Sequence, residues 1–301
     1  MAGAVRVRVL GRDRLGEVTR ILAAWEPPGG SPLGLHVGDI GWHARLPDVE
    51  FDGTVRVLER AGGVVAVGVF EPGLARPRLA PGAETDPVVC AALADEVESD
   101  PGEQVWSDAA PGTLLRTELS ARGWTLDPEP WVALYRPLSR GDGGLGKAGD
   151  EAVRPVDGET DVADRVAVQR ASFEGSTFTV NAWHRMAATR AYDPALDLLA
   201  RDTDGQPVAA ATAWAAGPGR CGILEPMGTH RAARGRGHGR RVVLAALAAL
   251  ARAGASGVTV HTPASNSGAV ATYVSCGLRP LQSTEALVRG IQRSTSASPT
   301  P

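Results

Sequence analysis

A turn crowded with glycine and arginine joins a strand pattern to a helix pattern, and this feature restricts the possible folds most strongly. The turn lies within residues 225–239, and the helix predicted after it spans 240–253, where apolar residues recur at three- and four-residue spacing. The first turn of a helix leaves backbone N–H groups without partners and carries partial positive charge. A short strand, a glycine turn and a helix start, in this order, therefore predict a site for a phosphate or pyrophosphate.

Glycine and arginine have separate roles in this turn. Gly235, Gly237 and Gly239 carry no Cβ, so a ligand can lie against the backbone and unusual φ angles cost little. Guanidinium groups donate hydrogen bonds in a geometry that suits phosphate oxygens. The arginines that surround the glycines are Arg231, Arg234, Arg236, Arg240 and Arg241. His230 and His238 flank the turn and are further candidates for phosphate binding.

A second pattern follows the predicted helix, which Gly254 is expected to end. Residues 257–261 are rich in β-branched side chains and predict a strand. Asn266, Tyr273 and the pair Gly277-Leu278 come next. Ser265 or Asn266 is expected to cap a short helix that carries Tyr273, and Gly277 is expected to end that helix.

Together the two segments resemble the GNAT N-acetyltransferases. Arg234-Gly235-Arg236-Gly237-His238-Gly239 matches the Arg/Gln-x-x-Gly-x-Gly/Ala pattern of the loop that binds the acetyl-CoA pyrophosphate in that family. The spacing from Asn266 to Tyr273 and Gly277 matches a second family pattern, with Leu278 where members usually have Phe. The resemblance implies that acetyl-CoA is the cosubstrate, that no metal takes part, and that the acetyl group moves directly to a primary amine of a small molecule or peptide.

The resemblance also implies roles for individual residues. A strand that splays from its neighbour offers backbone groups to the pantetheine arm, and here that strand contains Met227, Gly228 and Thr229. Family members often have proline two residues after this strand, where this chain has Arg231, so the loop is either more mobile or uses Arg231 on the phosphates. The implied cofactor-binding residues are Met227, Gly228, Thr229, Arg234, Gly235, Arg236, Gly237, His238, Gly239, Arg240 and Asn266.

Three side chains are candidates for proton transfer. Tyr273 is the candidate acid, because a phenol stays protonated at neutral pH and can give its proton to a departing thiolate. A lysine-like amine must lose a proton before it can attack. His261 and Glu225 are alternative bases for that step, and Asn266 can either bind the pantetheine arm or only cap its helix. Candidate residues around the acceptor are Glu174, Ser176, Trp183 and Tyr192.

Bulk properties exclude several other functions. The net charge is −3, so the charge of the whole chain gives no argument for nucleic-acid or membrane binding. Cys90, Cys221 and Cys276 have no CxxC spacing and predict buried, reduced thiols rather than a metal site. No apolar run is long enough to cross a bilayer, and the N-terminus lacks a signal-peptide core, so a cytoplasmic protein is expected.

The chain is predicted to contain two similar blocks. A strand at residues 5–9 and a helix at 14–25 open the first, and a strand at 152–155 and a helix at 161–173 open the second. We therefore expect a mixed α/β (α+β) fold of two tandem GNAT-like domains, each with a mostly antiparallel twisted sheet flanked by helices. The expected division is a domain at 1–138, a linker at 139–150, a catalytic domain at 151–291 and a disordered tail at 292–301. Tandem GNAT proteins such as mycothiol synthase are the closest architectural resemblance.

The first block lacks the arginine-glycine loop. Asp86 stands before Pro87 at the start of its predicted helix at 87–97, as an ordinary helix cap. A carboxylate there competes with a phosphate, so this domain is expected to bind no acetyl-CoA and to be structural or to border the acceptor site. The competing functions are an acetyl-CoA-binding sensor without catalysis and an Arg-Gly RNA-binding segment, and the chain is expected to be a monomer or homodimer.

Overall fold

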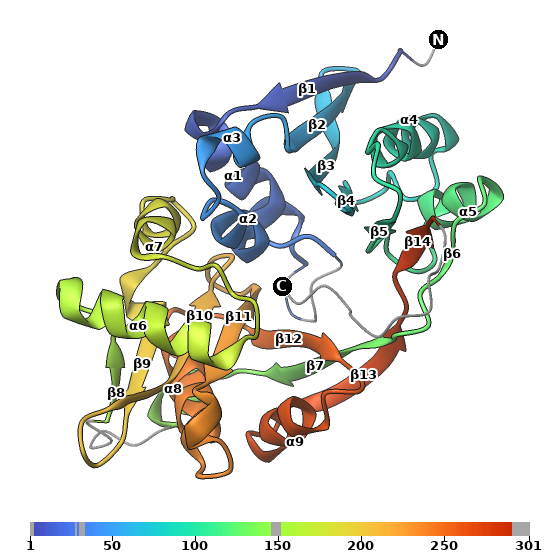
Figure 1. Cartoon of the computed structure of the whole chain (residues 1–301). Helices are drawn as coiled ribbons and strands as arrows, with labels where there is room; N and C mark the ends of the chain where they lie inside the picture. Colours follow the sequence, from blue (N-terminus) through green and yellow to red (C-terminus); the bar gives the residue numbers. More distant parts are fainter. Residues whose placement is uncertain (1–2, 28, 30–33, 146–151, 291–301) are drawn as a thin grey trace.

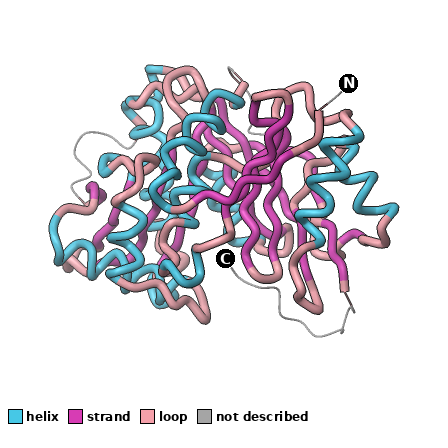
Figure 2. Tube along the Cα trace, turned by 90° about the horizontal axis from the view of Figure 1, so that it is seen from above, coloured by secondary structure: helices cyan, strands magenta, loops and turns pink. Residues whose placement is uncertain are grey.

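The structure is a computed structural model that describes residues 3–27, 29, 34–145 and 152–290. Its strands form two seven-stranded mixed sheets, with helices packed beside the strands (Figures 1 and 2). In each sheet one pair of neighbours is parallel and the other pairs are antiparallel. The predicted mixed α/β fold with two tandem GNAT-like units is therefore confirmed.

The first sheet has the order β1-β2-β3-β4-β5-β14-β6. Its strands are β1 (Arg6–Leu10), β2 (Val55–Arg60), β3 (Gly63–Glu71), β4 (Leu74–Leu79), β5 (Val105–Ser107), β14 (Leu287–Arg289) and β6 (Thr125–Leu126). The helices of this half are η1 (Arg12–Arg14), α1 (Leu15–Trp25), α2 (Val37–His43), α3 (Asp48–Phe51), α4 (Pro87–Glu98) and α5 (Leu114–Ala121). Apolar residues of α4 and α5 pack on one set of strand side chains and those of α1 and α2 on another, so both faces of the sheet are covered.

The second sheet has the order β13-β7-β12-β11-β10-β9-β8. Its strands are β13 (Arg279–Thr284), β7 (Trp131–Pro137), β12 (Gly257–Pro263), β11 (Cys221–Thr229), β10 (Pro207–Trp214), β9 (Asp197–Arg201) and β8 (Val153–Pro155). Its helices are α6 (Gly158–Ser172), α7 (Val180–Ala187), η3 (Pro194–Leu196), η4 (Arg231–Ala233), α8 (His238–Arg252) and α9 (Ser267–Ser275). Ala209 and Ala211 of β10 pack with α8 and Ala210 with α6, because successive strand side chains point to opposite faces.

Each half contributes one strand to the other half's sheet. Strand β7 lies between β12 and β13, and β14, close to the end of the chain, lies between β5 and β6 (Figure 1). The sequence predicts a final strand for each block, at residues 131–135 and 286–288, and would place each strand in the sheet of its own block. The sheets therefore interlock across the boundary predicted at residue 138, and the domain division itself stays a prediction.

The predicted linker begins with ordered structure. Arg140–Gly144 form the 3-10 helix η2, which Asp142 and Ser139 cap, and Arg252 of α8 donates a hydrogen bond of 3.0 Å to the carbonyl of Gly143. The rest of the predicted linker, residues 146–150, and the predicted disordered tail at 292–301 lie outside the described residues. Within the described part of the chain, no helix is long and apolar enough to cross a membrane.

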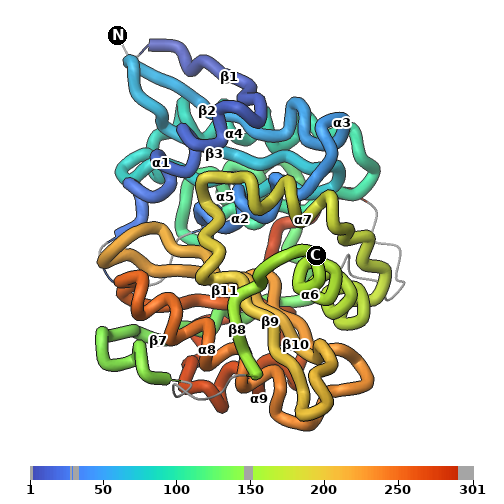
Figure 3. Tube along the Cα trace, turned by 90° about the vertical axis from the view of Figure 1, so that its left-hand side faces the viewer, coloured from blue at the N-terminus to red at the C-terminus, as the bar shows by residue number. Residues whose placement is uncertain are grey.

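Helix α2 is buried at the level where the two halves meet, beside α7 (Figure 3). Val37 and Ile40 belong to the core of the first half. Trp42 instead packs with Phe178 and Trp214 of the second half. Six of its seven residues are buried, and its two polar side chains, Asp39 and His43, form hydrogen bonds within the protein, so the helix has no solvent-facing stripe.

Candidate active site

Strands β11 and β12 separate after a short parallel pairing. Cys221 pairs with Gly257 and Ile223 with Thr259, but among the described residues no pairing between these strands follows, although they continue to Thr229 and Pro263. The other edge of β11 still pairs with β10 as far as Thr229. Residues 225–229 therefore present a strand edge whose backbone groups have no partner in β12, at the place where the sequence predicted the splayed strand.

The arginine-glycine loop leads directly from this edge into α8. Gly237 is the N-cap residue of α8 with φ +84°, and its helix start has no side-chain capping bond. Gly235 has φ +75°, and a Cβ added to either glycine would meet nothing within 4 Å. Both glycines thus occupy the left-handed region that favours glycine and border open space.

Two arginines of the loop are anchored to the end of α6. The Arg234 guanidinium donates to the carbonyl of Ser172 at 2.7 Å, and that of Arg231 donates to the carbonyl of Ala171 at 3.0 Å. Arg236 is exposed. Nδ1 of His238 is one of four buried side-chain polar atoms without a hydrogen-bond partner in the described part of the chain. The loop thus combines an uncapped helix start, guanidinium groups and an unsatisfied ring nitrogen, a donor set that suits a pyrophosphate.

Two other glycines of the predicted site are required by packing. A Cβ on Gly228 would lie 2.6 Å from Cβ of Ser172, and a Cβ on Gly239 would lie 2.9 Å from Oγ1 of Thr229. Gly228 thus allows α6 to approach β11, and Gly239 allows α8 to approach it. For Gly239 the structure gives a reason other than the ligand contact that the sequence suggested.

Helix α9 has the predicted caps. The Asn266 side chain accepts a hydrogen bond of 3.2 Å from the amide of Ala269, and Gly277, with φ +85°, ends the helix. Tyr273 is only 4% exposed within the core of the second half. Burial, the Cys276 thiol and the Glu225 carboxyl all raise the pKa of Tyr273, so its phenol stays protonated over a wide pH range.

The two candidate bases occupy different electrostatic environments. Burial and the neighbouring Asp39 raise the pKa of Glu225 to about 7, against the opposing effect of Arg76. His261 lies on β12 with its ring accessible to water, and desolvation by the surrounding protein lowers its pKa. The charges of Asp39 and Arg76 act on the pKa of both Glu225 and His261, so the two candidate bases share one electrostatic environment. The charge of Glu225 also raises the pKa of Tyr273.

The predicted acceptor-lining residues divide into two groups. Trp183 and Tyr192 both donate hydrogen bonds to Asp197, at 2.8 and 3.2 Å, and Asp197 is itself fully buried beside Arg165. These two aromatic side chains therefore have a clear structural role. Glu174 is exposed and Ser176 is half-buried just beyond α6.

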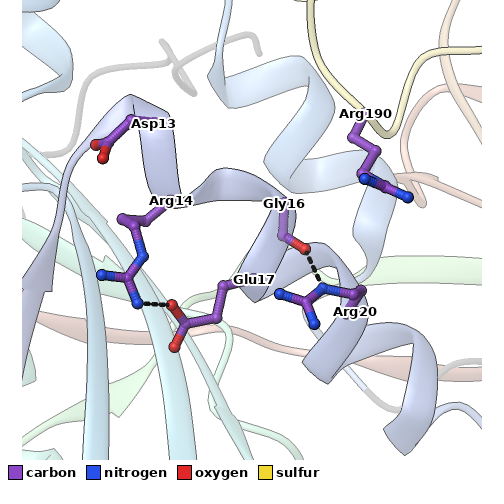
Figure 4. A pocket seen from close by; sticks show the side chains of 6 residues that line it. All are labelled: Asp13, Arg14, Gly16, Glu17, Arg20 and Arg190. Atoms are coloured by element: carbon purple, nitrogen blue, oxygen red, sulfur yellow. Dashed lines mark hydrogen bonds and ion pairs between the residues drawn. The ribbon is translucent and has the colours of Figure 1, made fainter.

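The structure also contains a pocket away from these residues. Figure 4 shows this pocket of about 370 Å³ at the start of α1. Arg14 pairs with Glu17 and Arg20 donates to the carbonyl of Gly16, so its polar groups partly satisfy one another. The lining residues are Asp13, Arg14, Gly16, Glu17, Arg20 and Arg190, and none of them belongs to the predicted site.

Other predictions can be compared with the structure directly. Cys90, Cys221 and Cys276 are free and buried, as predicted. Asp86 caps α4 by accepting from the amides of Val88 and Val89, which confirms that cap. Over the described residues, no group of three or more His, Cys, Asp or Glu side chains is arranged to hold a metal ion.

Sequence reasoning left open whether the first half borders the acceptor site, and it did not identify the residues of that half that lie near Glu225. Asp39 of α2 and Arg76 of β4 lie beside Glu225, although some 150 to 190 residues separate them along the chain. The only trace in the sequence is the glycine pair Gly38 and Gly41 around Asp39, because glycines three apart on a helix allow a close approach. That pattern does not say what approaches.

Comparisons with known proteins agree with this geometry. Residues 168–278 match the family model described as the acetyltransferase (GNAT) family. None of the curated proteins compared with the chain matches it. A tandem GNAT protein from the clavulanic acid biosynthesis pathway has a similar structure, with a TM-score of 0.59 and 14% identity over 95% of this chain and 98% of its own.

Two further solved structures share the fold. A GCN5-related N-acetyltransferase from Sphaerobacter thermophilus has a TM-score of 0.54 and 17% identity over 97% of this chain and 98% of its own. A GNAT-family acetyltransferase from Colwellia psychrerythraea has a TM-score of 0.54 and 12% identity over 94% and 98%. The chain thus has the tandem GNAT architecture, and residues 168–278 within its second half are similar to the GNAT acetyltransferase family.

Proposed function

We propose that the second half transfers an acetyl group from acetyl-CoA to a primary amine of a small molecule or peptide. The observation that carries the proposal is the splayed edge of β11 leading into an uncapped helix start. Acetyl-CoA supplies the acetyl thioester for this reaction. The first half has a carboxylate cap at the start of α4, and we propose that it binds no acetyl-CoA.

The coenzyme would be held by two parts of the chain. The free edge of Met227, Gly228 and Thr229 offers backbone groups for the pantetheine amides. The loop from Arg234 to Gly239, with Arg240, offers donors for the pyrophosphate. The side-chain oxygen of Asn266 already accepts from Ala269, so we assign Asn266 mainly to capping α9.

Two side chains would move the protons. The Glu225 carboxylate takes a proton from the acceptor ammonium, and with a pKa of about 7 roughly half of the Glu225 side chains are ionised and able to do so at neutral pH. As the amine nitrogen bonds to the acetyl carbon, the carbon–sulfur bond breaks and Tyr273 gives its phenol proton to the sulfur. We prefer Glu225 to His261 as the base because Glu225 also acts on Tyr273.

The first test is acetyl-CoA binding by calorimetry, with wild type, Arg234→Glu and Gly237→Val. Micromolar binding that both variants lose supports the loop as the site. Arg6→Glu, an exposed arginine on β1, controls for the change in charge and should bind normally. The absence of binding by wild type would remove the basis of the proposal.

The second test separates an enzyme from a sensor. Release of CoA is followed while a panel of amines is offered to wild type and to Tyr273→Phe. Amine-dependent release that Tyr273→Phe slows without weaker acetyl-CoA binding supports transfer. Tight binding without release for any amine supports the sensor instead. The predicted likeness to mycothiol synthase, and the monomeric or homodimeric state, stay predictions.

A further inference from the structure

The Glu225 carboxyl lies against a helix of the other half of the chain. The charges that act most strongly on it are those of Asp39 on α2 and Arg76 on β4. Both residues belong to the half that has no arginine-glycine loop. The proposed base is therefore bordered by protein outside its own domain.

Helix α2 is held tightly on the second half. A Cβ on Gly38 would lie 2.5 Å from Cγ of Trp214, and a Cβ on Gly41 would lie 2.2 Å from Cζ3 of the same ring. Trp214 is fully buried and its indole N–H donates to the backbone carbonyl of Glu225. Nε2 of His36, just before α2, lies 3.1 Å from the carbonyl of Cys221 on β11. Helix α2 therefore packs on the Trp214 indole, which is in turn hydrogen-bonded to β11, the strand that carries Glu225.

Asp39 is fixed between these two glycines by two hydrogen bonds. Oδ2 accepts from the amide of His36 at 2.6 Å, and Oδ1 accepts from the Arg76 guanidinium at 2.9 Å. The Asp39 side chain is 14% exposed. Arg76 also lies 3.9 Å from a carboxylate oxygen of Asp108. The position of the Asp39 carboxylate is therefore determined by these two hydrogen bonds and not by a flexible side chain.

We propose that the first half completes the active site, with Asp39, held by His36 and Arg76, as the positioning residue of the Glu225 carboxyl. This inference rests on the proposed function in one respect, the role of Glu225 as the base. The first half, which has no coenzyme-binding loop, would then influence proton transfer at Glu225 as well as support the fold.

The charges around Glu225 act in opposite directions. Burial and the negative charge of Asp39 raise its pKa, whereas Arg76 and Arg45 lower it. Replacing Asp39 by Asn removes a like charge and leaves the arginines in place, so the Glu225 pKa should fall. Replacing Arg76 by Gln should raise it. The other titratable groups linked to this neighbourhood are His36, His43, Glu71, Asp108, His261 and Tyr273.

The direct test is a carboxyl-13C NMR titration of protein labelled at glutamate, with the Glu225 signal assigned by its loss in Glu225→Gln. We expect a wild-type midpoint near 7, a midpoint lower by about one pH unit or more in Asp39→Asn, and a higher midpoint in Arg76→Gln. Arg76→Lys keeps the positive charge, so its Glu225 midpoint should return from the raised value of Arg76→Gln toward the wild-type value. The Arg76 variants change no residue of α2 and keep the hydrogen bond from the His36 amide to Asp39, so they test the proposal even if Asp39→Asn does not fold.

The matched control is Asp142→Asn. Asp142 also occupies the third position of a capping box, accepts from an arginine, Arg136, at 2.6 Å, and is 18% exposed. Loss of such a cap alone should leave the Glu225 midpoint unchanged. Equal midpoints in wild type, Asp39→Asn and Arg76→Gln would overturn the inference.

A second readout follows the reaction. With an amine that wild type acetylates, the acid limb of the kcat/KM profile should move down in pH in Asp39→Asn and up in Arg76→Gln. A loss of kcat without any movement of this limb would mean a merely structural role. Absence of transfer by wild type counts against the proposed function alone, because the NMR titration does not depend on turnover.

Discussion

The contact between α2 and Trp214 makes Gly41→Ala a sharp test of how the two halves are joined. A Cβ at this position would lie 2.2, 2.6 and 2.8 Å from three carbons of the indole ring. Ordinary carbon–carbon contacts are about 3.5 to 4 Å, so the overlap exceeds an ångström. Because Trp214 is fully buried, the ring has no free space to enter, and the helix itself must shift.

The expected cost follows from two opposing effects. Overpacking a well-packed core costs typically about 1 to 3 kcal/mol, and this overlap with three ring atoms places the variant at the upper end. Alanine is favoured over glycine inside a helix by about 1 kcal/mol. The net expectation is a loss of about 2 kcal/mol in the free energy of unfolding.

Urea or thermal unfolding followed by circular dichroism measures this loss. Gly16→Ala is the matched control, because Gly16 also lies in a helix, α1, and its Cβ would meet Arg190 at an ordinary 3.5 Å. We expect this control to be neutral or stabilised. Trp214→Phe removes the ring atoms nearest Gly41, so Gly41→Ala should cost less in that background than in wild type. A Gly41→Ala protein as stable as Gly16→Ala would refute the tight seating of α2.

Four further expectations concern the site and the core. Gly237→Val should weaken acetyl-CoA binding at least about tenfold in calorimetry, because a β-branched residue disfavours φ +84° and its side chain would enter the space beside the loop. Tyr273→Phe should lower kcat for amine acetylation by about 100-fold with unchanged acetyl-CoA affinity, and an unchanged kcat would contradict its role as the acid. A base must be ionised to act, so kcat/KM should rise with pH and level off above about 7 through Glu225, and a flat profile from pH 5 to 8 would contradict that assignment. Arg165→Met should cost about 3 to 5 kcal/mol in unfolding experiments, because it leaves Asp197 buried without its cation, and a loss below about 1 kcal/mol would contradict that pairing.

The local elements were predictable because they depend on neighbours in the sequence. The helix predicted at 240–253 corresponds to α8 at His238–Arg252, and the strand predicted at 257–261 corresponds to β12 at Gly257–Pro263. The caps at Asp86 and Asn266 were also foreseen. A cap or an apolar period involves residues only a few positions apart, so the sequence alone is sufficient to specify it.

The exchange of β7 and β14 was not predictable from the same patterns. Trp131–Pro137 has the composition of a strand, but composition does not tell a strand which sheet to join. The pairing of β7 with β12 and of β14 with β5 depends on residues more than 100 positions apart. Such contacts are decided by how the two halves pack as a whole.

The sequence by itself determined the candidate anion-binding loop, the helix that follows it and the candidate acid on α9, since each is a local pattern with a local physical cause. Only the tertiary structure decided what surrounds Glu225. The pKa of a carboxyl depends on burial and on every charge within a few ångströms, and those charges come here from Asp39 and Arg76. The charge of Asp39 reaches Glu225 because Gly38 and Gly41 let α2 lie directly on Trp214. This contact joins parts of the chain that no local pattern connects.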